Sequence, residues 1–113
     1  MVYDKARELA KLLSDSAEYA QYKQTKEVAI KNDTTKALLK EYHQLQIQAQ
    51  ASVVSGQKDE ALLERLQKMG ELLQMNQDAS AYLMAEYRLQ IMLSDVYKIL
   101  AEAIDIDLGM LEE

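Results

Sequence analysis

An all-α fold, organised as a small bundle of about five helices, is predicted by three features of this sequence. The 113 residues include no proline and only three glycines, so few positions interrupt a regular backbone. Glutamine, glutamate, lysine, leucine and alanine, which favour helices, dominate the composition. Apolar residues also recur every three or four positions along most of the chain, which is the spacing of one helix face.

Five helices are expected from the apolar stripes and from the polar residues between them, over residues 4–13, 16–31, 34–55, 60–75 and 79–104. Gly56 is suited to end the third helix, because glycine readily adopts the left-handed conformation found there. Asp59 is suited to begin the fourth, because its carboxylate can accept hydrogen bonds from free backbone N–H groups. We expect one domain over residues 1–113 that contains a long antiparallel helical hairpin. Acidic residues oppose the dipole at the end of the last helix, so residues 105–113 are expected to be a frayed tail.

The first half of the last helix is apolar on two sides. Its main stripe, expected to pack on neighbouring helices, consists of Tyr82, Ala85, Leu89, Met92, Val96, Ile99 and Ala103. A second set lies nearly half a turn away and consists of Leu83, Met84, Tyr87 and Ile91. The third helix carries a similar minor set, Ile47, Ala51 and Val54.

A helix with two apolar sides needs either a further helix or a second chain to cover them. We therefore interpret the minor sets as a candidate interface for a homodimer or another protein partner. The alternative is that the first two helices cover these faces within one chain.

Composition excludes several classes of protein. The absence of cysteine excludes disulfides, thiolate metal sites and cysteine nucleophiles, and it fits a reducing compartment, so we expect a cytoplasmic protein. The amino terminus is charged from Asp4 onward and does not have the pattern of a signal peptide. No run of about 18 apolar residues is present, so no insertion into a membrane is expected.

The net charge of -6 is unevenly distributed, with +2 on residues 1–58 and -8 on residues 59–113. A dedicated nucleic-acid binder should instead show a concentrated basic patch. The amino-terminal half nevertheless contains a weak candidate face for anions or RNA, formed by Lys23, Lys26, Lys31, Lys36 and Lys40. An ordinary solvated helix surface is the alternative interpretation of these lysines.

The sequence predicts no catalytic, cofactor-binding or metal site. The three glycines are isolated, so no nucleotide-binding loop is expected. His43 is the only histidine and follows the apolar position Tyr42, which favours an exposed or boundary residue over a base or a metal ligand. The Glu-x-x-His pairs of di-iron bundles are also absent. We therefore expect a protein that is not an enzyme.

A series of residues in a fixed order covers most of the chain. It begins with Tyr3-Asp4-x-Ala6-x-x-Leu9-Ala10, Ser16, Tyr19 and the region of Lys23, and continues with Asp33, Leu38/Leu39-x-x-Tyr42 and Gln46. It closes with Leu73-x-x-Asn76, Tyr82, Glu86, Leu89, Leu93, Val96, Ile99 and Ile104. In this order and spacing the chain resembles the YlbF/YmcA family of small bacterial helical proteins.

The resemblance implies a helical bundle, often dimeric, in the cytoplasm of Gram-positive-type bacteria. Characterised members of the family are regulators without evident enzymatic activity. They form a complex that influences competence, sporulation and biofilm development and that assists an endoribonuclease in messenger-RNA maturation.

Some members carry cysteines associated with an iron–sulfur cluster, whereas this chain has none and resembles the short, cysteine-free branch. The resemblance thus implies a regulator or adaptor with unidentified protein partners. The alternative is an RNA-associated accessory factor.

Overall fold

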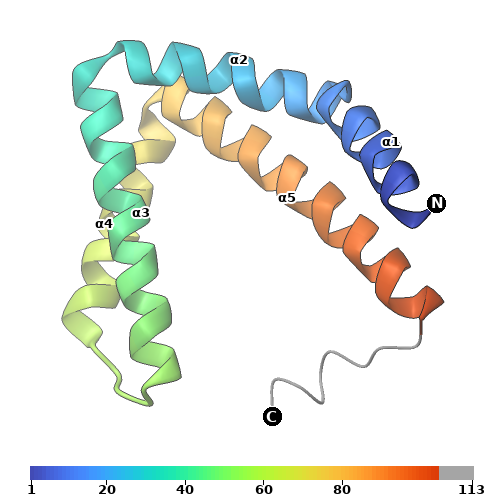
Figure 1. Ribbon diagram of the computed structural model, residues 1–113. Coiled ribbons are helices and arrows are strands. Elements are labelled where there is room, and N and C mark those ends of the chain that lie inside the picture. Colours follow the sequence, from blue (N-terminus) through green and yellow to red (C-terminus); the bar gives the residue numbers. More distant parts are fainter. Residues whose placement is uncertain (105–113) are drawn as a thin grey trace. The chain divides into compact units, whose positions relative to one another are not determined.

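The computed structural model describes residues 1–104, which contain five α-helices and no strand (Figure 1). The helices are α1 (Val2–Ser14), α2 (Ala17–Lys31), α3 (Asp33–Val54), α4 (Glu60–Met75) and α5 (Gln77–Ala103). The predictions of an all-α fold and of five helices are confirmed. Each helix begins and ends within two residues of its expected position. The frayed tail expected at 105–113 lies outside the described residues.

The chain divides into two compact units. The hairpin unit comprises residues 23–83, which hold α3, α4, the second half of α2 and the start of α5. The terminal unit comprises residues 1–22 together with residues from 84 onward, which hold α1, the start of α2 and most of α5. The division falls inside α2 and α5, and the organisation of residues 1–113 as one domain stays a prediction.

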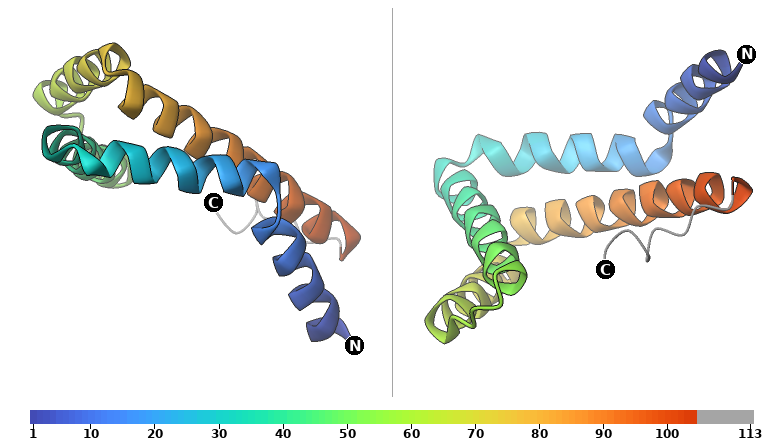
Figure 2. Two further views of the ribbon diagram at one scale, coloured as in Figure 1. Left: turned by 90° about the horizontal axis from the view of Figure 1, so that it is seen from above. Right: turned by 60° about the horizontal axis from the view of Figure 1, so that its bottom comes forward.

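Most of the buried apolar side chains belong to the hairpin unit. In this unit α3 and α4 pack against each other as an antiparallel hairpin (Figures 1 and 2). The buried apolar residues of the unit are Ala29, Leu39, Leu45, Leu62, Leu73, Ala79 and Tyr82. They come from all four helical segments of the unit, so the core joins these segments.

The turn between α3 and α4 depends on one glycine and one aspartate. Gly56 has a positive φ of 77°, and the N–H of Gln57 donates to the carbonyl of Ser52 at 3.0 Å. This is the left-handed helix end that Gly56 was expected to provide. Asp59 Oδ1 accepts from the N–H of Leu62 at 3.0 Å and thereby caps α4, also as expected.

Two asparagines cap the helices at the opposite end of the hairpin unit. Asn32 Oδ1 accepts from the N–H of Thr35 at 3.1 Å and caps α3, while Asn76 Oδ1 accepts from the N–H of Ala79 at 3.1 Å and caps α5. The Asn76 amide also donates to Thr35 Oγ1 at 2.8 Å. Because the Thr35 side chain is 2% exposed, this hydrogen bond fixes the start of α3 beside the junction of α4 and α5.

The main stripe of α5 differs from the expectation beyond Ala85. Tyr82 and Ala85 are buried, but the stripe becomes half-buried from Leu89 and is exposed at Ile99. Among the described residues, only α1 and the start of α2 accompany this part of α5 in the terminal unit. These short segments supply too little apolar surface to cover both sides of the helix.

Two neighbouring leucines of α4 provide a test of where the core lies. Leu73 has no exposed surface, whereas Leu72 is 54% exposed. We expect Leu73→Ala to lower the free energy of unfolding by about 2–5 kcal/mol, because it removes buried methyl groups and leaves a cavity. Leu72→Ala should lower the free energy of unfolding far less. Urea unfolding followed by circular dichroism at one fixed protein concentration measures both, and equal losses would contradict this assignment of the core.

The hydrogen bond between Asn76 and Thr35 is tested by a second matched pair. Thr35→Val keeps the shape of the side chain but leaves the Asn76 amide without its acceptor, so it should lower the free energy of unfolding by about 1–3 kcal/mol. Thr34 lies next to it in α3 and is exposed, so Thr34→Val should change stability by less than about 0.5 kcal/mol. Thermal unfolding of the two variants and the wild type compares their stabilities. A Thr35→Val variant as stable as the wild type would refute the role of this hydrogen bond.

Candidate functional site

The predicted apolar set in the second half of the chain lies on one exposed face of α5. Met84, Tyr87 and Ile91 are spaced by three and four residues, so their side chains project from the same side of the helix. All three are exposed, and Tyr87 has 62% of its surface in contact with solvent. The structure therefore brings these three predicted residues together on an uncovered face of the terminal unit.

The other predicted interface residues belong to the hairpin unit. Ile47, Ala51 and Val54 follow one another along one face of α3, and all are exposed, Val54 by 88%. Leu83 is half-buried in the same unit. The predicted set thus forms two separate groups, one on α3 and one on α5, with Leu83 partly withdrawn into the core of the hairpin unit.

A groove that the sequence analysis missed lies in the terminal unit. It has a volume of about 660 Å³ and is lined by Met1, Val2, Lys5, Ala6, Leu9 and Leu100. All of these residues except Lys5 are apolar, and Val2 is 80% exposed. The apolar spacing of α1 is visible in the sequence, but a helix face that packs in a core has the same spacing. Only the structure shows that this face is open.

The five lysines of the candidate anion or RNA face are all exposed and all belong to the hairpin unit. Lys40 lines a hollow of about 420 Å³ between α3 and α4, together with Arg65 and Glu41. Arg65 Nη2 and Glu41 Oε1 lie 3.5 Å apart, and this ion pair bridges α3 and α4. Because this carboxylate already offsets one positive charge, the hollow offers only a modest attraction for a phosphate.

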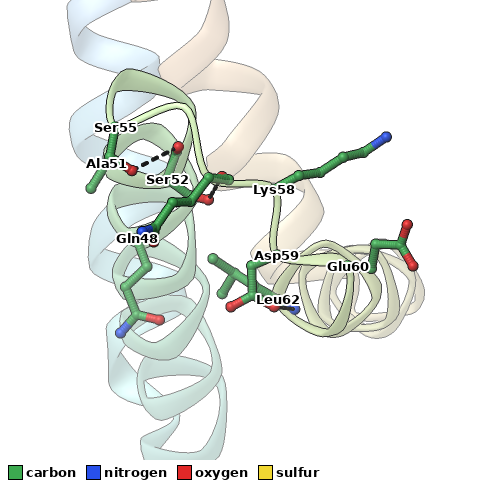
Figure 3. A pocket seen from close by; sticks show the side chains of 9 residues that line it. Gln48, Ala51, Ser52, Ser55, Lys58, Asp59, Glu60 and Leu62 are labelled. Atoms are coloured by element: carbon green, nitrogen blue, oxygen red, sulfur yellow. Dashed lines mark hydrogen bonds between the residues drawn. The ribbon is translucent and has the colours of Figure 1, made fainter.

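A wide hollow of about 1080 Å³ lies at the turn between α3 and α4 (Figure 3). Its serines are already engaged, since Ser55 Oγ donates to the Ser52 carbonyl at 3.0 Å and Ser52 Oγ donates to the Gln57 carbonyl. Lys58 and Glu60 extend away from these serines (Figure 3). The hollow therefore contains no serine paired with a base, which nucleophilic catalysis would require.

Residues 1–104 contain no group of three or more histidine, cysteine, aspartate or glutamate side chains that could hold a metal ion. His43 is half-buried on α3, which is the boundary position of the two that were expected, exposed or boundary. Over the same residues, no helix combines the length and the apolar character needed to cross a bilayer.

Comparison with known proteins identifies relatives over nearly the whole chain. A UPF0342 protein of Clostridium tetani is 37% identical over 96% of this chain and 94% of its own length. A UPF0342 protein of Halothermothrix orenii is 36% identical over 93% of this chain and 90% of its own length.

A solved structure, described as a protein of unknown function (DUF964) from Bacillus stearothermophilus, has the same fold. Its TM-score is 0.81 at 19% sequence identity, with 92% of each chain covered.

The profile of one protein family matches residues 2–105, and its description is "Control of competence regulator ComK, YlbF/YmcA". This match spans more than nine-tenths of the sequence and agrees with the order of residues from Tyr3 to Ile104 that carried the resemblance. Together with the relatives of more than 30% identity, it shows that the chain, which lacks cysteine, belongs to the YlbF/YmcA family.

Proposed function

We propose that this protein is a non-enzymatic regulator or adaptor that acts in the cytoplasm by binding other proteins through exposed apolar helix faces. The observation that carries the proposal is α5 from Met84 onward, where apolar side chains are exposed on more than one side. The description of its family refers to the control of a competence regulator, and regulation of this kind needs contacts with other macromolecules. We further propose that the protein acts in the processes that the family resemblance implies, namely competence, sporulation, biofilm development and messenger-RNA maturation.

The exposed α5 face is suited to binding another helix. Met84, Tyr87 and Ile91 present a flexible, an aromatic and a branched side chain along one line. Interfaces are enriched in aromatic residues and methionine, and a helix commonly binds through residues with this spacing. Exposed apolar surface costs solubility unless a partner covers it, so we propose that this face mediates a homodimer and contacts with further partners.

Replacing the apolar side chains of this face with charged ones tests the homodimer. Tyr87→Asp and Ile91→Asp place a carboxylate in the proposed interface, so each should raise the dissociation constant of the dimer by roughly tenfold or more. The helical content should stay near that of the wild type, because both side chains are already exposed. Sedimentation equilibrium at micromolar concentrations measures the association, and circular dichroism measures the helicity.

The same helix supplies a control. Ser94 continues the face one turn beyond Ile91, where the face becomes polar, so Ser94→Asp should leave association nearly unchanged. A wild-type protein that is monomeric at micromolar concentration would contradict the homodimer. An oligomer that Tyr87→Asp and Ile91→Asp leave intact would instead exclude these residues from the interface.

A second candidate function is RNA binding by the hairpin unit. It is favoured by the five exposed lysines of this unit and by the position of Lys40 beside Arg65 in the hollow between α3 and α4. Phosphate contacts from such side chains are independent of base sequence and weaken as salt concentration rises. This candidate ranks second because Glu41 partly neutralises the hollow.

Charge reversal tests the RNA-binding candidate. Lys36→Glu and Lys40→Glu should weaken RNA binding at low salt, and each should reduce the slope of log affinity against log salt by about one. Lys58→Glu changes an exposed lysine in the turn between α3 and α4 and is the matched control. Filter binding of single-stranded RNA over a salt series measures the slope. Absence of binding by the wild-type protein at low salt would reject this function.

A further inference from the structure

The groove of the terminal unit lies between the start of α1 and the end of α5. Its lining residues are Met1, Val2, Lys5, Ala6 and Leu9 on one side and Leu100 on the other. Helix α1 has 13 residues and buries none of them. An isolated helix of this length is only marginally stable in water, so an apolar segment bound along the groove would stabilise α1.

The α5 side of the groove leads directly to the last segment of the chain. Leu100 is 52% exposed and Ile104 is 66% exposed, so exposed apolar side chains continue from the groove to the residue before that segment. Helix α5 ends at Ala103, and residues 105–113 follow shortly after it. Nine residues span up to about 30 Å when extended, whereas the α1 side of the groove is only about 12 Å long. The segment is therefore long enough to reach every residue that lines the groove.

The composition of residues 105–113 matches the groove in apolar character. Four of the nine residues have large apolar side chains, and these are Ile106, Leu108, Met110 and Leu111. The groove has a volume of about 660 Å³, which falls within the range of clefts that hold a drug-sized molecule. It can therefore accept several of these side chains at once.

The charges of the segment and of the groove are opposite in sign. The segment has four acidic residues and no basic one, whereas α1 has three basic residues against two acidic ones. Lys5 is the charged residue of the groove, and its exposed ion pair with Glu8 is weak enough to leave it available to a second carboxylate. Helix α1 also begins without a side-chain cap, so the positive end of its dipole favours a negative charge nearby.

We propose that residues 105–113 bind in the groove of their own chain, with apolar side chains against Ala6 and Leu9 and carboxylates beside Lys5 and the start of α1. Because the segment is attached next to the groove, its effective concentration there is of millimolar order, and a modest affinity suffices. Another protein reaches the groove only by displacing the segment. The occupancy does not depend on protein concentration and is thus separate from the proposed homodimer, which uses the α5 face at Tyr87.

Introduced cysteines test this contact cleanly, because the chain has none of its own. Ala6→Cys places a thiol in the groove. Arg7→Cys places one at the next position, which is also exposed but does not line the groove and points about 100° away around α1. Each is combined with Leu108→Cys, which keeps a small apolar side chain in the segment.

The effective concentration of the thiol pair, measured against glutathione at low protein concentration, is the readout. A disulfide requires Cβ atoms about 4 Å apart, so its formation reports contact. The effective concentration should be at least about tenfold higher for the Ala6→Cys pair than for the Arg7→Cys pair. Equal values would overturn the inference. Disulfides that join two copies, seen by electrophoresis without reductant, would also overturn it, because another chain would then cover the groove.

Thiol accessibility gives a second measurement that needs no cysteine in the segment. A single Ala6→Cys thiol should react with an aromatic disulfide reagent several-fold more slowly than the same thiol in a chain that also carries Leu108→Asp and Leu111→Asp. The reaction of a single Arg7→Cys thiol should be nearly the same in both chains. An Ala6→Cys thiol whose reaction rate is unchanged by the two aspartates would show that the segment does not occupy the groove.

Discussion

Burial of apolar side chains between α3, α4 and the ends of α2 and α5 is the constraint on which the rest of the structure depends. Leu73 of α4 has no exposed surface, and Leu39, Leu45 and Tyr82 of the same hairpin unit are also buried. The hydrogen bond from the Asn76 amide to Thr35 Oγ1 supplements this apolar packing, because it holds the start of α3 beside the start of α5. The hairpin unit therefore has a core of its own, whereas Ala85 is the one buried apolar side chain among the described residues of the terminal unit.

This difference links the fold to the proposed function. The hairpin unit has a buried core to which the second half of α2 and the start of α5 contribute. The second half of α5 and the whole of α1 then present apolar faces that solvent alone would not stabilise. We propose that such a protein acts by association, since a partner that covered these faces would also stabilise the helices that carry them. The groove at Leu100 and the face at Tyr87 lie on different sides of α5, so this helix exposes apolar side chains in two directions.

Sequence patterns predicted the helices closely because their ends are determined locally. Asp59 and Gly56 act through hydrogen bonds and backbone conformation within a few residues, and these effects can be recognised without the fold. The candidate face at Met84, Tyr87 and Ile91 was also predictable, because its side chains repeat with the helix period. The groove at Ala6 and Leu9 was not, because apolar spacing has the same appearance whether a face is buried or open. The partial burial of Leu83 and the exposure of Ile99 likewise depend on which segments pack beside α5, and that is a property of the whole fold.

Hydrogen exchange of the wild-type protein at high and at low concentration tests the central claim most directly. Amide protection reports local opening, so it distinguishes helices held by the core from helices held by association. The account predicts that α3 and α4 are protected at both concentrations, while the part of α5 after Ala85 is less protected on dilution. Equal protection of this part of α5 at both concentrations would contradict it.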